Sequence, residues 1–376
     1  MKFLHTGDLH IGKKIFEVSL IEDQKLILDQ IFDIAVEEAV DALVIAGDVY
    51  DRAVPSTEAV AALDDFLTRL VRKDIPVIMI SGNHDSGERV AFADRILEGQ
   101  GLYIAGSYEE PLKCVRLEDE WGPVYFVCMP FVKPSAAGCA DSAAAVEKML
   151  AGLPEFGEGA RTVLVTHFFV TGDHGKEPEV SDSETGISVG GLDMVPSSLF
   201  DEFSYTALGH IHKPQCMRAG KVFYAGAPLK YSFSEARGDK SVNLVELDGR
   251  GLAGVERRTL RPLHEVRCIR GNLKDLMAAV KTDSDRADYI QATLTDQEEL
   301  IDPIGTLRSV YPNVLQILLE KNVPRAEEEY ISRLAGERKG TVSLFEDFYE
   351  MLKGEPLEEN RRRIVEETVR EAEESI

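Results

Sequence analysis

The strongest constraint on this chain is a pattern that occurs five times: a short apolar segment that runs directly into an aspartate, asparagine or histidine. Short apolar segments rich in branched side chains are typical of strands buried on both faces of a sheet. Because the ends of such strands meet along one edge of a sheet, we expect the polar residues that follow them to converge there. These residues are Asp8, His10, Asp48, Asn83, His84, Asp85, His167, His210 and His212.

Between the first of these segments, apolar residues recur at the spacing of an α-helix. Residues 22–40 place Leu28 and Ile31 on one side of a helix. Pro55-Ser56-Thr57 has the composition of a helix start and precedes a second amphipathic stretch. Strands and helices therefore alternate through residues 1–261, which predicts an α/β domain built on a largely parallel sheet with both faces covered.

A smaller unit follows at residues 262–323. It contains three segments with strand character and two helical segments between them, and it carries no cluster of candidate ligands. We therefore predict a small α+β module that is accessory to the first domain. The predicted strands are residues 266–269, 289–294 and 314–319, and the predicted helices are residues 273–280 and 304–310.

The tail, residues 324–376, is dominated by charged side chains around one apolar patch at helical spacing. Gly354-Glu355-Pro356 breaks this pattern, and residues 358–374 read as a charged helix. The apolar area is too small to fold alone, so we favour docking on a partner protein over packing on the chain's own domain. The patch consists of Val342, Leu344, Phe345, Phe348, Tyr349 and Leu352.

A polar stretch from Gly172 to Pro196, rich in glycine, serine and acidic residues, predicts a long loop between two of the ligand-bearing strands. Long loops in compact domains are often functional or mobile. Two interpretations stay open: the loop forms the rim of a substrate site, or it is an ordinary surface loop.

Composition narrows the class of partner and the compartment. The formal net charge is -24, which argues against an indiscriminate polyanion binder, although bound divalent cations and local basic patches leave nucleic acid possible as a substrate. The five cysteines are scattered without a Cys-x-x-Cys pair, which favours reduced thiols over disulfides or a thiolate zinc site. No segment is apolar enough to cross a membrane or to act as a signal peptide, so we expect a cytoplasmic protein.

Carboxylate, amide and imidazole ligands without sulfur suit manganese, iron or zinc. Asp8 and His10 have the same spacing as His210 and His212, so the two pairs could serve different ions, and Asp48 has two oxygens with which to bridge them. Two ions about 3.5–4 Å apart can activate a bridging water and hold both ends of an in-line displacement at phosphorus. Each motif alone is weak evidence, but their joint order is specific.

This order of motifs, over residues 8–212, resembles the calcineurin-like metallophosphoesterase superfamily. Residues 47–56 and 231–237 are similar to the SbcD family within it, the nuclease subunits of SbcCD complexes, and the accessory module and tail are also similar. The resemblance implies a metallophosphoesterase fold with central β-sheets sandwiched by helices. It also implies that the accessory module is a capping or DNA-binding domain and that the tail is a helical segment.

The resemblance further implies a role for each site residue. One ion would be held by Asp8, His10 and His212, and the other by Asn83, His167 and His210. Asp48 would lie between two divalent ions, most plausibly Mn²⁺. His84 would not bind metal but would protonate the leaving oxygen or stabilise charge on the phosphate. Asp85 would orient His84, although a helix N-cap is the simpler interpretation of this residue.

The function implied by the resemblance is a manganese-dependent DNA nuclease for recombination, repair and replication. It would act as a 3′ to 5′ exonuclease on double-stranded ends and as an endonuclease on hairpins or single strands. A homodimer would join two SbcC-type ATPases, whose coiled coil receives the tail. One alternative is a small-molecule or cyclic-nucleotide phosphodiesterase, which fits the acidic composition but gives no reason for residues 262–376. A scaffold with a structural metal is the other, and His84 argues against it.

Overall fold

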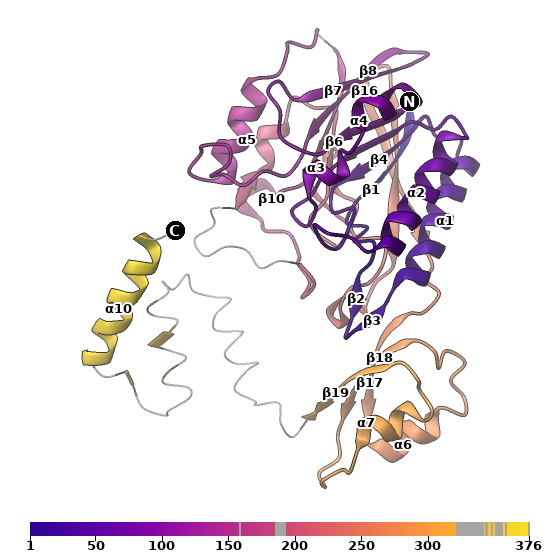
Figure 1. Cartoon of the computed structure of the whole chain (residues 1–376), viewed down its shortest axis with the longest axis vertical. Coiled ribbons are helices and arrows are strands. Elements are labelled where there is room, and N and C mark those ends of the chain that lie inside the picture. The colour runs from indigo at the N-terminus through magenta and orange to yellow at the C-terminus, as the bar shows by residue number, and fades with distance from the viewer. Residues whose placement is uncertain are drawn as a thin grey trace.

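The computed structural model describes residues 1–157, 159–184, 193–320, 342, 345–346, 349, 356–357 and 359–374. Its main body contains two six-stranded sheets (Figure 1). The first sheet is formed by β1 (Lys2–Thr6), β4 (Ala42–Ala46), β5 (Val77–Ile80), β6 (Leu102–Ala105), β15 (Lys240–Asp248) and β16 (Gly251–Leu260). The second is formed by β7 (Lys113–Asp119), β8 (Gly122–Met129), β9 (Arg161–Thr166), β12 (Tyr205–Leu208), β13 (Gln215–Arg218) and β14 (Val222–Tyr224).

Each sheet contains four adjacent parallel strands, with antiparallel strands at one edge of the first sheet and at both edges of the second. In the first sheet, whose order is β16-β15-β1-β4-β5-β6, the four strands from β1 to β6 run parallel. In the second sheet, whose order is β13-β14-β12-β9-β8-β7, the four central strands run parallel. The parallel sheet predicted from periodicity is therefore present, and the second sheet confirms the central β-sheets that the resemblance implied and that periodicity alone did not show. Apolar periodicity shows that both faces of a strand are buried, and it does not show what buries them.

The two sheets pack against each other, and helices cover their outer faces. The core between the sheets includes Phe3 from β1 and Phe126 from β8, whose rings meet edge to face at 5.4 Å. Helices α1 (Ile21–Glu37) and α2 (Thr57–Val71) pack on the first sheet, and α5 (Ser142–Ala151) packs on the second. In Figure 1, α5 lies on the opposite side of the body from α1 and α2. The resulting layer order is helix, sheet, sheet, helix.

Short elements connect these layers. The predicted helix start at Ser56 is confirmed, because the Ser56 hydroxyl accepts a hydrogen bond from the N–H of Ala59 at 3.2 Å. In the described residues, no helix is both long enough and apolar enough to span a bilayer. The remaining short elements are β2 (Lys14–Ile15), β3 (Val18–Ser19), α3 (Gly87–Val90), α4 (Asp94–Leu97), η1 (Glu98–Gln100), β10 (Phe169–Thr171), η2 (Asp173–Gly175), β11 (Met194–Pro196), η3 (Ser197–Phe200) and η4 (Phe233–Glu235).

The accessory module contains every strand and helix that the sequence predicts for it. Its three strands are parallel in the order β17-β18-β19, and each pair is connected by a helix. Leu276, Ile290 and Leu307 belong to a core of its own. Its elements are β17 (Val266–Gly271), α6 (Leu273–Ala279), β18 (Tyr289–Leu294), α7 (Pro303–Arg308) and β19 (Val314–Leu319).

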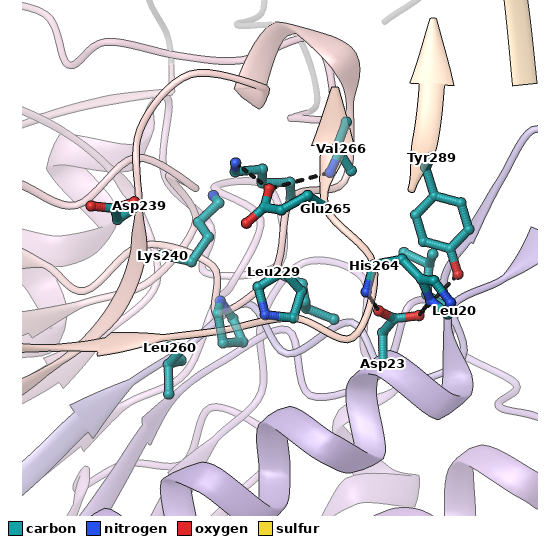
Figure 2. Close-up of a pocket in the computed structure, with 13 residues that line it drawn as sticks. Leu20, Asp23, Leu229, Asp239, Lys240, Leu260, His264, Glu265, Val266 and Tyr289 are labelled. Carbon is teal, nitrogen blue, oxygen red and sulfur yellow. Dashed lines mark hydrogen bonds and ion pairs between the residues drawn. The ribbon is translucent and has the colours of Figure 1, made fainter. Parts of the chain in front are cut away.

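A buried aspartate joins the accessory module to the first turn of α1. The carboxylate of Asp23 accepts hydrogen bonds from the backbone N–H of His264 at 2.8 Å, from its Nδ1 at 3.1 Å and from the hydroxyl of Tyr289 at 2.9 Å. Figure 2 shows these side chains converging beside a small pocket. The ammonium of Lys230 and the carboxylate of Glu265 form a second link at 2.6 Å. Because three donors satisfy this buried carboxylate, the junction is polar and geometrically specific.

The tail is described only in part. Its final helix is α10 (Glu359–Glu374), at the position where a charged helix is predicted. Arg361 of this helix contacts the hydroxyl of Tyr349, and Arg362 forms an ion pair with Glu346 at 3.1 Å. The predicted linker, and the apolar residues Leu344, Phe348 and Leu352 of the predicted patch, lie outside the described residues.

Candidate metal centre

The polar residues that follow the five apolar segments meet at one edge of the sheet sandwich. Strands β1, β4 and β5 of the first sheet and β9 and β12 of the second end there. The edge is therefore shared by the two sheets, whereas the apolar pattern alone pointed to the edge of one sheet. The side chains brought together there are those of Asp8, His10, Asp48, Asn83, His167, His210 and His212.

In four of the five segments, a glycine stands directly before the first candidate ligand. Two of these glycines permit a very close approach between neighbouring parts of the chain. A Cβ on Gly209 would lie 1.9 Å from the carbonyl oxygen of Ala46, which belongs to the other sheet. A Cβ on Gly82 would lie 2.1 Å from the Oδ1 atom of Asp48. A side chain would clash at both positions, because the backbone comes close to the other sheet at Gly209 and to the neighbouring turn of the same sheet at Gly82.

Backbone strain is concentrated at the same residues. The φ angles of Asp8, His10, Asp48 and His210 are 51°, 42°, 48° and 98°, in the left-handed region that residues with a side chain rarely adopt. Each such residue costs on the order of 1–3 kcal/mol, so the surrounding structure must hold it in place. Cross-strand hydrogen bonds do so: the N–H of Asp8 donates to the Gly47 carbonyl at 3.0 Å, and that of His10 to the Asp48 carbonyl at 2.9 Å.

The first group of donors contains Asp8, His10 and His212. The Nε2 atoms of the two histidines lie 3.2 Å apart, deep in the protein. The Oδ1 atom of Asp8 accepts from the backbone N–H of His210 at 2.8 Å, whereas its Oδ2 atom is buried without a hydrogen-bond partner among the described residues. Buried polar atoms without partners are rare, and a divalent cation between these atoms would satisfy them.

The second group contains Asn83, His167 and His210. The Oδ1 atom of Asn83 lies 3.0 Å from Nε2 of His167 and 3.0 Å from Nδ1 of His210. The Nδ1 atom of His167 donates to the Ala46 carbonyl at 2.8 Å. In the neutral ring, Nε2 is therefore unprotonated, and its lone pair faces the Oδ1 atom of Asn83. Burial opposes protonation of His167, but the charges of Asp48 and Asp8 outweigh it and raise its pKa to about 9.

Asp48 lies between the two groups. Its Oδ2 atom is 3.6 Å from Nε2 of His10 and 3.3 Å from Nε2 of His167, while its Oδ1 atom accepts the backbone N–H of His84 at 2.9 Å. Burial alone would raise the pKa of the Asp48 carboxyl, but His167 and His10 lower it below its usual range. Asp48 therefore remains a carboxylate that contacts both sets of donors.

His84 and Asp85 occupy the rim of the cluster. The Nδ1 atom of His84 lies 3.2 Å from the carbonyl oxygen of Asp51, and its ring meets that of His10 edge to face with centroids 4.9 Å apart. Asp85 has three backbone partners that the sequence did not predict. Its carboxylate accepts the backbone N–H groups of Val49, Tyr50 and Gly82 at 2.9–3.0 Å, which ties the turn after β5 to the turn after β4. The N-cap of α3 is Ser86, one residue further along the chain.

Two buried side chains that were not among the predicted site residues hold the turn that carries His10. The Nε2 atom of Gln24 donates to the His10 carbonyl at 2.7 Å and to the Leu9 carbonyl at 3.2 Å, and its Oε1 atom accepts the N–H of Gly12 at 2.9 Å. The hydroxyl of Tyr231 donates to the Leu9 carbonyl at 2.5 Å. Gln24 carries no local signal, because it lies within a stretch that reads as an ordinary helix.

Not every histidine near this edge belongs to the cluster. His5 lies within β1 and is fully buried between the sheets, where its Nδ1 atom meets the Tyr205 hydroxyl at 2.8 Å and its Nε2 atom meets the Leu208 carbonyl at 3.2 Å. Burial lowers its pKa to about 3, so the ring is neutral. His5 is a satisfied core residue, which shows that position at a strand end, and not residue type alone, defines a candidate ligand.

Comparisons with known proteins agree with this geometry. The sequence profile described as calcineurin-like phosphoesterase matches residues 1–214, and the profile described as the type 5 capsule protein repressor C-terminal domain matches residues 261–352. The D subunit of the SbcCD nuclease of Staphylococcus epidermidis is 31% identical over an alignment of 360 residues, and the match covers 93% of this chain and 92% of that protein.

Solved structures with lower similarity include a protein of Thermus thermophilus and a dimetal phosphatase from Danio rerio. The first is 14% identical with a TM-score of 0.43, over 69% of this chain and 99% of that one. The second is 12% identical with a TM-score of 0.39, over 70% of this chain and 99% of that one.

A layered α/β body with buried oxygen and nitrogen donors at the strand ends, together with the profile match over residues 1–214, defines a metal-dependent phosphoesterase, a hydrolase. Within the calcineurin-like phosphoesterase family, the chain belongs to the group of the D subunits of SbcCD nucleases.

Proposed function

We propose that this chain is the DNA nuclease subunit of an SbcCD-type complex and that its cluster binds two Mn²⁺ ions. The observation that carries this proposal is the position of Asp48, whose carboxylate contacts two separate groups of donors. The similarity to an SbcCD subunit extends over 93% of the chain, well beyond the phosphoesterase profile. A function that uses the whole chain is therefore favoured.

Each ion has its own ligand set in this proposal. Asp8, His10 and His212 hold one ion, while Asn83, His167 and His210 hold the other, with Asp48 shared. The donors contain no sulfur, and Mn²⁺ accepts such a mixture of carboxylate, amide and imidazole ligands. When bound, the ions supply Lewis-acid stabilisation of the phosphate and activate water for attack.

The chain's own residues orient these ligands and handle the proton. The Ala46 carbonyl fixes the tautomer of His167, and Gln24 holds the backbone on either side of His10. His84, half-exposed at the rim, is the group we propose to protonate the leaving oxygen or to stabilise phosphate charge. Asp85 maintains the turn that carries Asn83 and His84, which makes it a positioning residue in this proposal.

DNA is the proposed substrate, and a small-molecule or cyclic-nucleotide diester is the alternative. Both would use the same metal ligands. The alternative suits the net charge of -24 but leaves the accessory module and tail without a role. In our proposal the module is a cap or a DNA-binding element, and the tail docks on the coiled coil of an SbcC-type ATPase in the cytoplasm.

The proposal is tested by incubating the purified chain with Mn²⁺ and labelled blunt duplex DNA, hairpin DNA or a cyclic nucleotide, each with and without an SbcC-type ATPase. We expect cleavage of the hairpin, and 3′ to 5′ shortening of the duplex that depends on the ATPase. Hydrolysis of bis-p-nitrophenyl phosphate would not separate the two substrates, because any such site performs it. Turnover of the cyclic nucleotide with intact DNA would instead support the alternative.

We also propose that the chain forms a homodimer through the surface around α4. Phe92, just before this helix, is 81% exposed, and Ile96 within it is 76% exposed. Large apolar side chains exposed together on one short segment are typical of an interaction surface.

Replacing Phe92 and Ile96 with glutamate should convert the dimer to a monomer, because the charges would be desolvated at the interface. Light scattering after size exclusion measures this change, and hydrolysis of bis-p-nitrophenyl phosphate should persist. Ile301→Glu is the matched control, since Ile301 is 93% exposed on the accessory module, away from α4. A double variant that still has the mass of a dimer would refute this interface.

A further inference from the structure

His212 has two ring nitrogens with different surroundings. Its Nε2 atom faces His10 in the first donor group, at 3.2 Å. Its Nδ1 atom faces the opposite way, toward Ser183, whose hydroxyl oxygen lies 2.7 Å away. Ser183 belongs to the long polar loop, and the sequence offers no motif that connects it with the ligands.

The same hydroxyl reaches a buried ion pair. The Oγ atom of Ser183 lies 2.6 Å from Oε1 of Glu235, and Oε2 of Glu235 lies 2.6 Å from the ammonium of Lys240. Glu235 and Lys240 are both buried, and each would be costly to bury without the other. Glu235 is therefore a carboxylate, which can only accept hydrogen bonds.

The direction of each hydrogen bond follows from this charge. Ser183 has one hydroxyl hydrogen, and it must lie on the 2.6 Å contact with Oε1 of Glu235, because a carboxylate has no hydrogen of its own to place between the two oxygens. Toward His212, Ser183 therefore presents only a lone pair, so the Nδ1 atom of His212 must carry a hydrogen and donate it. In the neutral ring, Nε2 then carries no hydrogen, which is the state that a metal-binding nitrogen requires. This atom faces the other members of the first donor group.

Glu235 alone could not fix the ring in this way. Its Oε1 atom lies 3.8 Å from Nδ1 of His212, beyond hydrogen-bond distance. The serine hydroxyl spans this gap. Carboxylate groups often orient a metal-binding histidine directly through its second nitrogen, and here a serine from a distant loop stands between them.

Further hydrogen bonds keep the serine in place. The Oε1 atom of Glu184 accepts the backbone N–H of His212 at 2.5 Å, and the N–H of Asp182 donates to the hydroxyl of Ser234 at 2.9 Å. The ammonium of Lys240 also donates to the His212 carbonyl at 2.9 Å. The described residues 181–184 are thus attached both to His212 and to the segment that carries Glu235.

We propose that Ser183 is a positioning residue for His212: it transmits the charge of Glu235 to Nδ1 and holds Nε2 toward the ion bound with Asp8 and His10. This inference rests on the proposed metal function. It assigns part of the polar loop to the support of the metal site, a role separate from the substrate rim considered for this loop. Loss of such an outer partner typically lowers metal affinity or activity by about 10–100-fold.

The experiment compares Ser183→Thr with Ser183→Val in the full chain. Threonine and valine have nearly the same shape, so any strain from the larger side chain affects both, and they differ in the hydroxyl. Titration calorimetry with Mn²⁺ alone measures the affinity and number of ions, and Ser183→Ala removes the hydroxyl without adding bulk. Ser181→Ala is the loop control, because the Ser181 hydroxyl contacts that of Ser183 at 2.8 Å but not the ring of His212.

We expect valine and alanine at this position to weaken one of the two ions by about 10–100-fold and to leave the other unchanged. Threonine should stay within about threefold of the wild type, as should Ser181→Ala. Hydrolysis of bis-p-nitrophenyl phosphate at subsaturating Mn²⁺ should follow the same order, and excess Mn²⁺ should restore it. Wild-type affinity for both ions in Ser183→Val and Ser183→Ala, or equal loss in threonine and valine, would overturn the inference. Failure of the wild type to bind two ions would instead refute the proposed function.

Discussion

Replacing His84 with alanine should lower hydrolysis of bis-p-nitrophenyl phosphate and of DNA by about 10²–10⁴-fold, the usual contribution of a general acid or base, while Mn²⁺ binding stays intact. The Nδ1 atom of His84 lies 3.2 Å from the Asp51 carbonyl, which can only accept a hydrogen bond. Nδ1 is therefore protonated, and Nε2 is the nitrogen that can exchange a proton with substrate. The substitution removes this nitrogen but none of the seven proposed ligands.

The prediction is discriminating because the geometry also permits His84 to bind metal. Ligand atoms of His10, Asp48 and His84 lie within 4.8 Å of one another. If His84 were a ligand, His84→Ala would lose an ion in a Mn²⁺ titration, and excess Mn²⁺ would partly restore activity. If it handles the proton, the titration stays unchanged and excess Mn²⁺ restores nothing. His174→Ala, at an exposed histidine, controls for loss of an imidazole and should match the wild type.

Gly82→Ala should strongly weaken metal binding and hydrolysis, although it adds only one methyl group. The new Cβ would lie 2.1 Å from Oδ1 and 2.4 Å from the backbone nitrogen of Asp48. The first contact displaces the carboxylate that both donor groups share, and the second cannot be relieved by a side-chain rotation. We expect Mn²⁺ affinity to fall by about 100-fold or more, since even indirect partners of ligands have effects on that scale.

The same variant should lose roughly 1–3 kcal/mol of unfolding free energy, the usual cost of overpacking a tight site, as measured by urea denaturation. Gly99→Ala is the control, because a Cβ on Gly99 meets no atom within 4 Å and should change neither metal binding nor stability. Binding of two ions by Gly82→Ala with wild-type affinity would contradict the close approach of the turns after β4 and β5.

Much of the site could be anticipated because its components are local. The glycine before Asp48, the spacing of Asp8 and His10, and the apolar strand before each of them are properties of short segments. The elements of the accessory module were predictable for the same reason, since each strand or helix shows its own periodicity.

The errors and omissions concern contacts between distant segments. The apolar pattern predicted that the strands are buried on both faces, but it could not predict what covers each face, because a second sheet and a helix bury a strand equally well. Asp85 satisfies three backbone N–H groups from two turns, which no spacing within the chain reveals. Gln24 and Ser183 are ordinary residues in their local sequence and matter only because of where the fold places them.

The order of residues was enough to identify which side chains can bind a metal and that each stands at the end of a strand, because strand propensity and ligand chemistry reside in neighbouring residues. Folding in three dimensions was needed to establish that two sheets share the edge, that Asp48 contacts both donor groups, and that a loop serine supports His212. These relations depend on the packing of segments far apart in the chain, and hydrogen-bond geometry of a few tenths of an ångström has no counterpart in a linear sequence.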